Sequence, residues 1–181
     1  MRARIGRMDD LRYPTGKFTF DPHATADKRR TWIRAIAEAP AAMRAAVAGL
    51  SDEQLDTPYR PDGWTVRQVV HHVPDSHLNA YVRLKLALTE DSPTIKPYDE
   101  AAWALLADSE TTPVAVSLAL LEALHQRWVT ILESMEAKDF DRTFVHPEHG
   151  PVTVSWLLQL YAWHGRHHVA HITRLKGRKG W

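Results

Sequence analysis

The chain has 181 residues, of which 44% are hydrophobic and 25% charged, and this composition is typical of one ordinary globular domain. It contains no cysteine, which excludes disulfides, thiolate metal ligands and a cysteine nucleophile. A net charge of +1 argues against a nucleic-acid binder that works by neutralising phosphates, and no apolar run approaches the roughly 18 residues of a membrane span. We therefore expect neither nucleic acid nor a membrane as a partner.

Residues 1–26 show no periodicity and contain Pro14, Gly16 and Pro22, so we expect an irregular N-terminal arm packed on the rest of the protein. The arm starts with the basic segment 1–7, but no apolar stretch follows it. This pattern does not resemble a secretory signal, and we expect a cytoplasmic protein. The remaining residues, 27–181, are expected to form a single domain.

Helical periodicity recurs in four long segments of this domain. Thr65 and Gln68 form a capping box that predicts the start of the second. Pro40 and Pro74 lie inside the first and second segments, where a proline either kinks a helix or marks a wrong boundary. The predicted ranges are 27–49, 65–89, 111–137 and 153–176.

Shorter elements are expected between the long helices. Residues 51–54 have the form of a second capping box, residues 98–107 read as a short helix, and residues 138–152 read as a connector with a short hairpin around His149 and Gly150. Four long helices with short connections predict an all-α protein, a four-helix bundle with short extra helices.

Eleven histidines make an imidazole metal site the first functional question. His164 and His168 are four residues apart in the last predicted helix, the spacing that brings two imidazoles to one ion. They share an apolar stripe about 100° wide, and a buried imidazole needs a partner for each ring nitrogen. A metal would satisfy several at once, whereas hydrogen bonds to core carbonyls are the alternative. The residues of the stripe are Leu157, Tyr161, His164, His168, His171, Ile172 and Leu175.

A third ligand should come from another helix, because two imidazoles do not make a good zinc site. The second predicted helix offers His71, His72 and His77, and periodicity does not separate the first two. Glu122 and His125 have the Glu-x-x-His spacing of di-iron bundles, but such sites need a second copy of the motif.

Two strings in this chain resemble the DinB-like superfamily, and within it the YfiT-like metal-dependent hydrolases. They read YRPDGWTVRQVVHHVPDSH over residues 59–77 and WHGRHHVAHI over residues 163–172. The similarity also includes residues 97–103 and 124–128, so it extends from about Leu11 to the C-terminus.

The resemblance implies a four-helix bundle that holds one divalent ion, zinc or nickel, through three histidines with positions left open. The family pattern of a histidine three residues before an aspartate falls on His72, followed by Asp75, and the pair in the last helix falls on His164 and His168. Pro74 departs from the small residue expected there, which keeps His71 open as a substitute for His72.

For function, the resemblance implies a metal-dependent hydrolase that activates water for a small-molecule substrate. Relatives that transfer low-molecular-weight thiols make a thiol S-transferase with a thiol cosubstrate an alternative, and a homodimer is also implied. Asp75 could orient a ligand imidazole, His171 could carry protons, and Tyr161 could line the pocket.

A non-catalytic metal-binding bundle is the third interpretation. It would require a closed site with a fourth protein ligand, which could come from His71, His77, His125 or His171.

Overall fold

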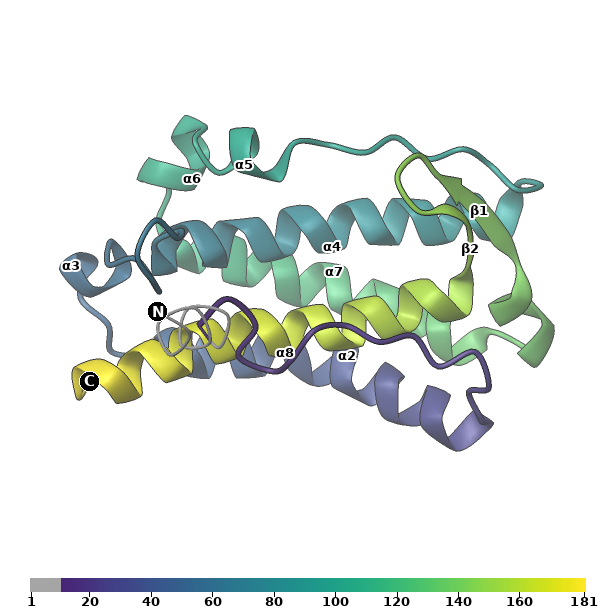
Figure 1. Cartoon of the computed structure of the whole chain (residues 1–181), viewed down its shortest axis with the longest axis horizontal. Helices are drawn as coiled ribbons and strands as arrows, with labels where there is room; N and C mark the ends of the chain where they lie inside the picture. The colour runs from purple at the N-terminus through teal and green to yellow at the C-terminus, as the bar shows by residue number, and fades with distance from the viewer. Residues whose placement is uncertain (1–10) are drawn as a thin grey trace, which may run out of the picture.

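Four long helices form a bundle in the computed structural model, which describes residues 11–181 (Figure 1). They are α2 (Ala26–Val47), α4 (Val66–Thr89), α7 (Val114–Ser134) and α8 (Val154–Lys179). Helix α2 packs against α7 and α8, and α4 packs against the same two helices, so the four close into a ring. The predicted helical bundle is confirmed.

Short elements fill the connections between the long helices. Strands β1 and β2 pair antiparallel, with His146 opposite Gly150, so the hairpin expected in the connector is present. It lies at the end of the bundle where α8 begins, while the segment between α4 and α7 runs along α4 (Figure 1). The short elements are α3 (Asp52–Leu55), α5 (Glu100–Trp103), α6 (Ala107–Thr111), the 3-10 helix η1 (Ala137–Asp141), β1 (Thr143–His146) and β2 (Gly150–Thr153).

Side-chain caps explain where the helices begin. The Thr65 hydroxyl accepts the Gln68 amide while the Gln68 side chain accepts the Thr65 amide, which completes the capping box before α4. The Ser51 box before α3 is also complete. Gly49, with φ 76°, provides the left-handed turn just after the end of α2.

Two boundaries in the middle of the chain differ from the prediction. The single helix expected over 98–107 is two short helices, α5 and α6, because Leu106 between them takes an extended conformation, with φ −76° and ψ 154°. Pro113 precedes α7 instead of lying inside it, and the extended Met135 ends that helix before residue 137.

The last helix is also longer than predicted. Gly177 was expected to end it, but α8 continues to Lys179, and Gly180 with φ 73° takes the left-handed conformation that ends the helix. A helical glycine costs about 1 kcal/mol relative to alanine. Packing of the preceding turns, where Ile172 and Leu175 are buried, offsets that cost.

Two prolines lie inside long helices without ending them. Pro40 lies in α2 and Pro74 in α4. Because proline has no N–H, the carbonyl four residues earlier has no partner within the helix. For Pro40 that carbonyl belongs to Ile36, whose side chain is completely buried.

The helices approach closely where α2 meets α8. A Cβ added at Gly165 would lie 3.1 Å from the Ala39 Cβ and 3.8 Å from the His77 Cε1. Gly165 therefore allows α8 to pack tightly on α2 and on the histidines between the helices.

The described part of the N-terminal arm runs along α8 (Figure 1). The Trp163 indole donates to the Gly16 carbonyl at 3.0 Å, and the Gln159 amide pairs with the backbone of Asp21 in both directions. The basic segment 1–7 lies outside the described residues. Within residues 11–181, no helix combines the length and apolar character needed to cross a membrane.

Candidate metal centre

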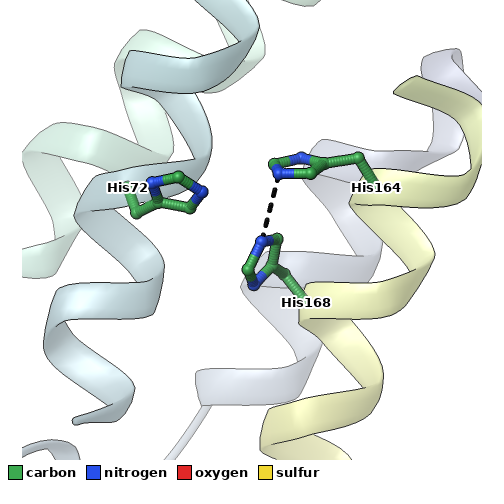
Figure 2. Close-up of side chains that lie close together, drawn as sticks. All are labelled: His72, His164 and His168. Atoms are coloured by element: carbon green, nitrogen blue, oxygen red, sulfur yellow. Dashed lines mark hydrogen bonds between the residues drawn. The ribbon is translucent and has the colours of Figure 1, made fainter. Parts of the chain in front are cut away.

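Three histidines from two helices converge between α4 and α8. Figure 2 shows His72 of α4 facing His164 and His168 of α8. The Nε2 atoms of His164 and His168 lie 3.1 Å apart, and one ligand atom from each of the three residues lies within 4.8 Å of the other two. The sequence expectation named these three residues, and the structure brings them together.

Burial keeps these imidazoles neutral. It lowers the pKa of His72 to about 4, and it holds the pKa of His164 and His168 well below the ordinary value, with repulsion between neighbouring imidazoles adding to the effect. A neutral imidazole has a bare nitrogen, and this is the form that binds a metal.

The spacing of the pair on α8 fits a divalent ion. Two bonds of 2.0–2.1 Å meeting at 90–109° would leave the nitrogens about 2.9–3.4 Å apart, and the observed separation is 3.1 Å. The Nδ1 of His168 is buried and has no hydrogen-bond partner in the described part of the chain. No carbonyl therefore anchors this ring, and its other nitrogen points at the triad of His72, His164 and His168. The donor set, three imidazoles, is one that zinc and nickel both accept.

The rings of His164, His77 and His125 form a row that leads from the triad to α2. His164 Nδ1 lies 3.1 Å from His77 Nε2, and His77 Nδ1 lies 2.8 Å from His125 Nε2. The row ends on the Ile36 carbonyl, 2.7 Å from His125 Nδ1. Pro40 leaves this carbonyl without its helical donor, so it is free to accept from His125.

The Ile36 carbonyl fixes which nitrogen carries the proton in every ring of the row. A carbonyl can only accept, so His125 donates through Nδ1 and its Nε2 is bare. His77 must then donate to His125 through Nδ1, and His164 must donate to His77 through Nδ1. The Nε2 of His164, which faces the other triad residues, is consequently bare and available to a metal.

The other predicted site residues lie outside the triad. Both nitrogens of His71 are engaged, with the Ser117 hydroxyl at 2.7 Å and the Thr112 carbonyl at 3.1 Å, so this ring is turned toward α7. His171 donates to the Arg12 carbonyl of the arm at 3.1 Å and stacks on Tyr59.

Asp75 makes no side-chain hydrogen bond to a histidine among the described residues, and burial raises its pKa to about 6. Tyr161 packs edge-on to His77, and its hydroxyl lies 3.3 Å from the Ser76 hydroxyl.

Sequence reasoning considered His77 and His125 only as possible metal ligands and missed their supporting role. Pro40 was the available signal, because a proline inside a helix leaves the carbonyl four residues earlier without its helical hydrogen-bond donor. Which side chain would supply that donor depends on how α2 and α7 pack, and this could not be read from the sequence.

A cavity of about 180 Å³ adjoins the triad and includes His164 in its wall. It lies between α4, α8, the β1–β2 hairpin and the segment before α5. Two larger hollows of about 550 and 700 Å³ are lined chiefly by α2 and α7 and contain no triad residue. The polar groups of the smaller cavity include Arg83, Tyr98, Glu100, His146, Glu148 and Tyr161.

The sequence pattern of the DinB superfamily matches residues 35–172, most of the chain. The chain belongs to the DinB superfamily. Proteins from Bacillus cereus strain 03BB102 and Bacillus anthracis strain A0248, each named "Putative metal-dependent hydrolase", are similar to it at 56% and 55% identity. Each alignment covers 96% of this chain and all of the relative.

A solved structure shares the fold of this DinB superfamily member. YfiT from Bacillus subtilis, described as "a probable metal-dependent hydrolase with an unusual four-helix bundle topology", superposes with a TM-score of 0.93 at 48% sequence identity. The match covers 95% of this chain and 99% of YfiT. The resemblance expected from the histidine-containing strings is therefore confirmed.

Proposed function

We propose that this protein is a metal-dependent hydrolase of small molecules, with one zinc or nickel ion held by His72, His164 and His168. The observation that carries the proposal is the convergence of three imidazoles, two buried and that of His164 partly buried, on one point beside a cavity. The names of the Bacillus relatives agree with it.

The chain supplies three ligands and leaves room for a substrate. When bound, a divalent ion in such an open site supplies Lewis-acid chemistry and lowers the pKa of a water or thiol that reaches it. The four histidines considered as fourth ligands are engaged elsewhere: His71 with Ser117 and Thr112, His77 and His125 in the row behind His164, and His171 with Arg12. This arrangement favours an open site over a closed structural one.

The protein's own groups have defined roles in this proposal. His77 and His125 hold the ring of His164 in one orientation. The Tyr161 and Ser76 hydroxyls lie in the wall of the cavity and can hydrogen-bond a bound molecule. The hairpin and the start of α8 supply two walls of the cavity, so a molecule bound there lies between them and α4.

Metal content per chain, after purification without a nickel column, tests the ligand set. We expect roughly one ion per wild-type chain, as in a mononuclear three-histidine site, and its loss in His72→Ala and His168→Ala. His71→Ala, at a buried histidine outside the triad, should retain the ion. Circular dichroism checks that each variant folds. Full retention of metal in both triad variants would refute the site.

A panel of ester and amide substrates, assayed with and without added low-molecular-weight thiols, tests the reaction. Metal-dependent turnover without thiol supports the hydrolase. Turnover that occurs only with added thiol would instead support an S-transferase. A metal-loaded protein that turns over nothing in either condition would support the non-catalytic bundle.

A further inference from the structure

We propose that the cavity beside the triad binds a carboxylate group of the substrate, with Arg83 as its anchor. The carboxylate subsite rests on the cavity itself, whereas the placement of the reacting bond at the triad rests on the proposed function. The ligand class is therefore a small monocarboxylate whose reactive group lies away from its acid end.

Arg83 is a buried cation without a counter-ion among the described residues. Only 9% of the residue is exposed, and one guanidinium nitrogen donates to the Lys96 carbonyl at 3.1 Å. Within residues 11–181, no carboxylate oxygen lies within 4.0 Å of it. A buried charge without a partner is costly. A carboxylate is the group that the planar guanidinium fork fits best, through two parallel hydrogen bonds.

A second buried donor in the same wall, the Tyr98 hydroxyl, is incompletely paired. It is inaccessible to solvent; the Ser76 hydroxyl is close enough to interact with it, but no described residue meets it at full hydrogen-bond geometry. Burial raises its pKa, so the hydroxyl keeps its proton and can donate. Arg83 and Tyr98 thus leave unused donors around one cavity, which is the arrangement that recognises an oxyanion.

His146 adds a third donor to this wall. Its Nδ1 accepts the backbone N–H of Glu148 at 3.2 Å, so in the neutral ring the proton is on Nε2. Burial lowers the pKa of His146, and the nearby Arg83 adds to that effect, so the ring is neutral at pH 7. It therefore offers an N–H and brings no second positive charge to the cavity.

The acidic groups of the cavity favour a monoanion. Glu100 and Glu148 line it, but both are exposed to solvent and neither contacts Arg83. Their negative charges would repel a phosphate dianion more strongly than a carboxylate. The subsite therefore selects a singly charged oxyanion.

The position of Arg83 sets the length of the ligand. Arg83 follows His72 by 11 residues on α4, which is about three turns and about 16 Å along the helix axis. The long arginine side chain spans part of this distance. The cavity volume of about 180 Å³ is below the roughly 300–1,000 Å³ of drug-sized pockets. A short chain with a carboxylate at one end and the reacting bond at the other fits these dimensions.

Binding of butyrate to the zinc-loaded protein, followed by NMR titration, tests the subsite directly. We expect saturable binding to wild type and roughly 10- to 100-fold weaker binding to Arg83→Met, the size of effect for a hydrogen-bonded charged group. Arg142→Met is the matched control, because Arg142 also donates to main-chain carbonyls, those of Ala87 and Glu90, but lies outside the cavity.

Equal affinity in Arg83→Met and wild type, or no saturable binding to wild type, would overturn the proposal. Arg83→Lys keeps the charge without the planar fork and should bind butyrate with intermediate affinity. This variant also covers the case in which Arg83→Met does not fold, because a fully folded Arg83→Lys with wild-type affinity contradicts a guanidinium anchor.

A pair of esters separates the subsite from the reaction. We expect wild type to cleave the anionic mono-p-nitrophenyl glutarate at least roughly 10-fold more efficiently in kcat/KM than the neutral p-nitrophenyl butyrate. Arg83→Met should remove this preference, whereas Arg142→Met, which alters a residue outside the cavity, should keep it. Cleavage of both esters with no preference overturns the subsite alone. Cleavage of neither, with butyrate binding lost only in Arg83→Met, overturns the hydrolase alone.

Discussion

Replacing His125 should weaken metal binding although His125 does not touch the triad. His125→Phe keeps a ring in the space but removes both nitrogens, so the Ile36 carbonyl loses its donor and His77 Nδ1 loses its acceptor. His77 can then donate to His164 through Nε2, which leaves the His164 proton on its own Nε2, facing the triad. We expect metal affinity to fall on the order of 10- to 100-fold, as for changes in groups that orient metal ligands.

The same substitution should also destabilise the fold by about 1–3 kcal/mol, the cost of leaving a buried polar group unpaired. Competition for Zn²⁺ against a chromophoric chelator measures the affinity, and ¹⁵N NMR of the imidazole rings reports which nitrogen carries the proton. His71→Phe is the control, because His71 is equally buried and hydrogen-bonded but outside the row. It should lose stability and keep its metal affinity. If His125→Phe leaves both the affinity and the His164 ring state unchanged, the reasoning about the histidine row is wrong.

Three further predictions concern stability and the arm. Burial lowers the pKa of His171 to about 4 from an unfolded value of about 6.5, so this residue should cost the metal-free protein about 1.4 kcal/mol of stability per pH unit as pH falls between those values. The urea midpoint of His171→Gln should therefore fall less steeply with decreasing pH than that of wild type. Arg67→Met should destabilise by about 1–2 kcal/mol in urea titrations by breaking the bond to Asp56 at 2.6 Å, and Asp56→Asn, which keeps a hydrogen-bond acceptor, should cost less. Trp163→Phe should speed tryptic cleavage at the exposed Lys17 about fivefold by removing one hydrogen bond to the arm, and unchanged cleavage would show that this bond does not hold the arm.

The beginnings of the helices could be predicted from the sequence better than their ends. A capping side chain such as Ser51 or Thr65 acts on backbone amides within three residues, so the whole interaction is visible in a short string. The end of α8 depends on competition between Gly177, Gly180 and the packing of earlier turns against α2 and α4. Tertiary packing decided it, and the nearer glycine stayed helical.

The histidine pair on α8 could be placed from its periodicity, but the partner on α4 could not. His71 and His72 are 4% and 7% exposed, so both sides of α4 are buried and the helix shows no polar face to separate them. The family resemblance pointed to His72, and the structure turns His72 toward α8 and His71 toward Ser117 of α7. The row through His77 and His125 joins residues 48 and 87 positions apart, beyond the reach of any local pattern.

The proline in α2 has a consequence for anyone who would transplant this centre. Copying His72, His164 and His168 onto another four-helix scaffold would reproduce the ligands but leave the ring of His164 free to choose its proton position. Helix α2, which contributes no ligand, decides that choice through the Ile36 carbonyl that Pro40 sets free. A working graft therefore needs an accepting group at the end of the histidine row, here a main-chain carbonyl that the proline frees from its helical donor.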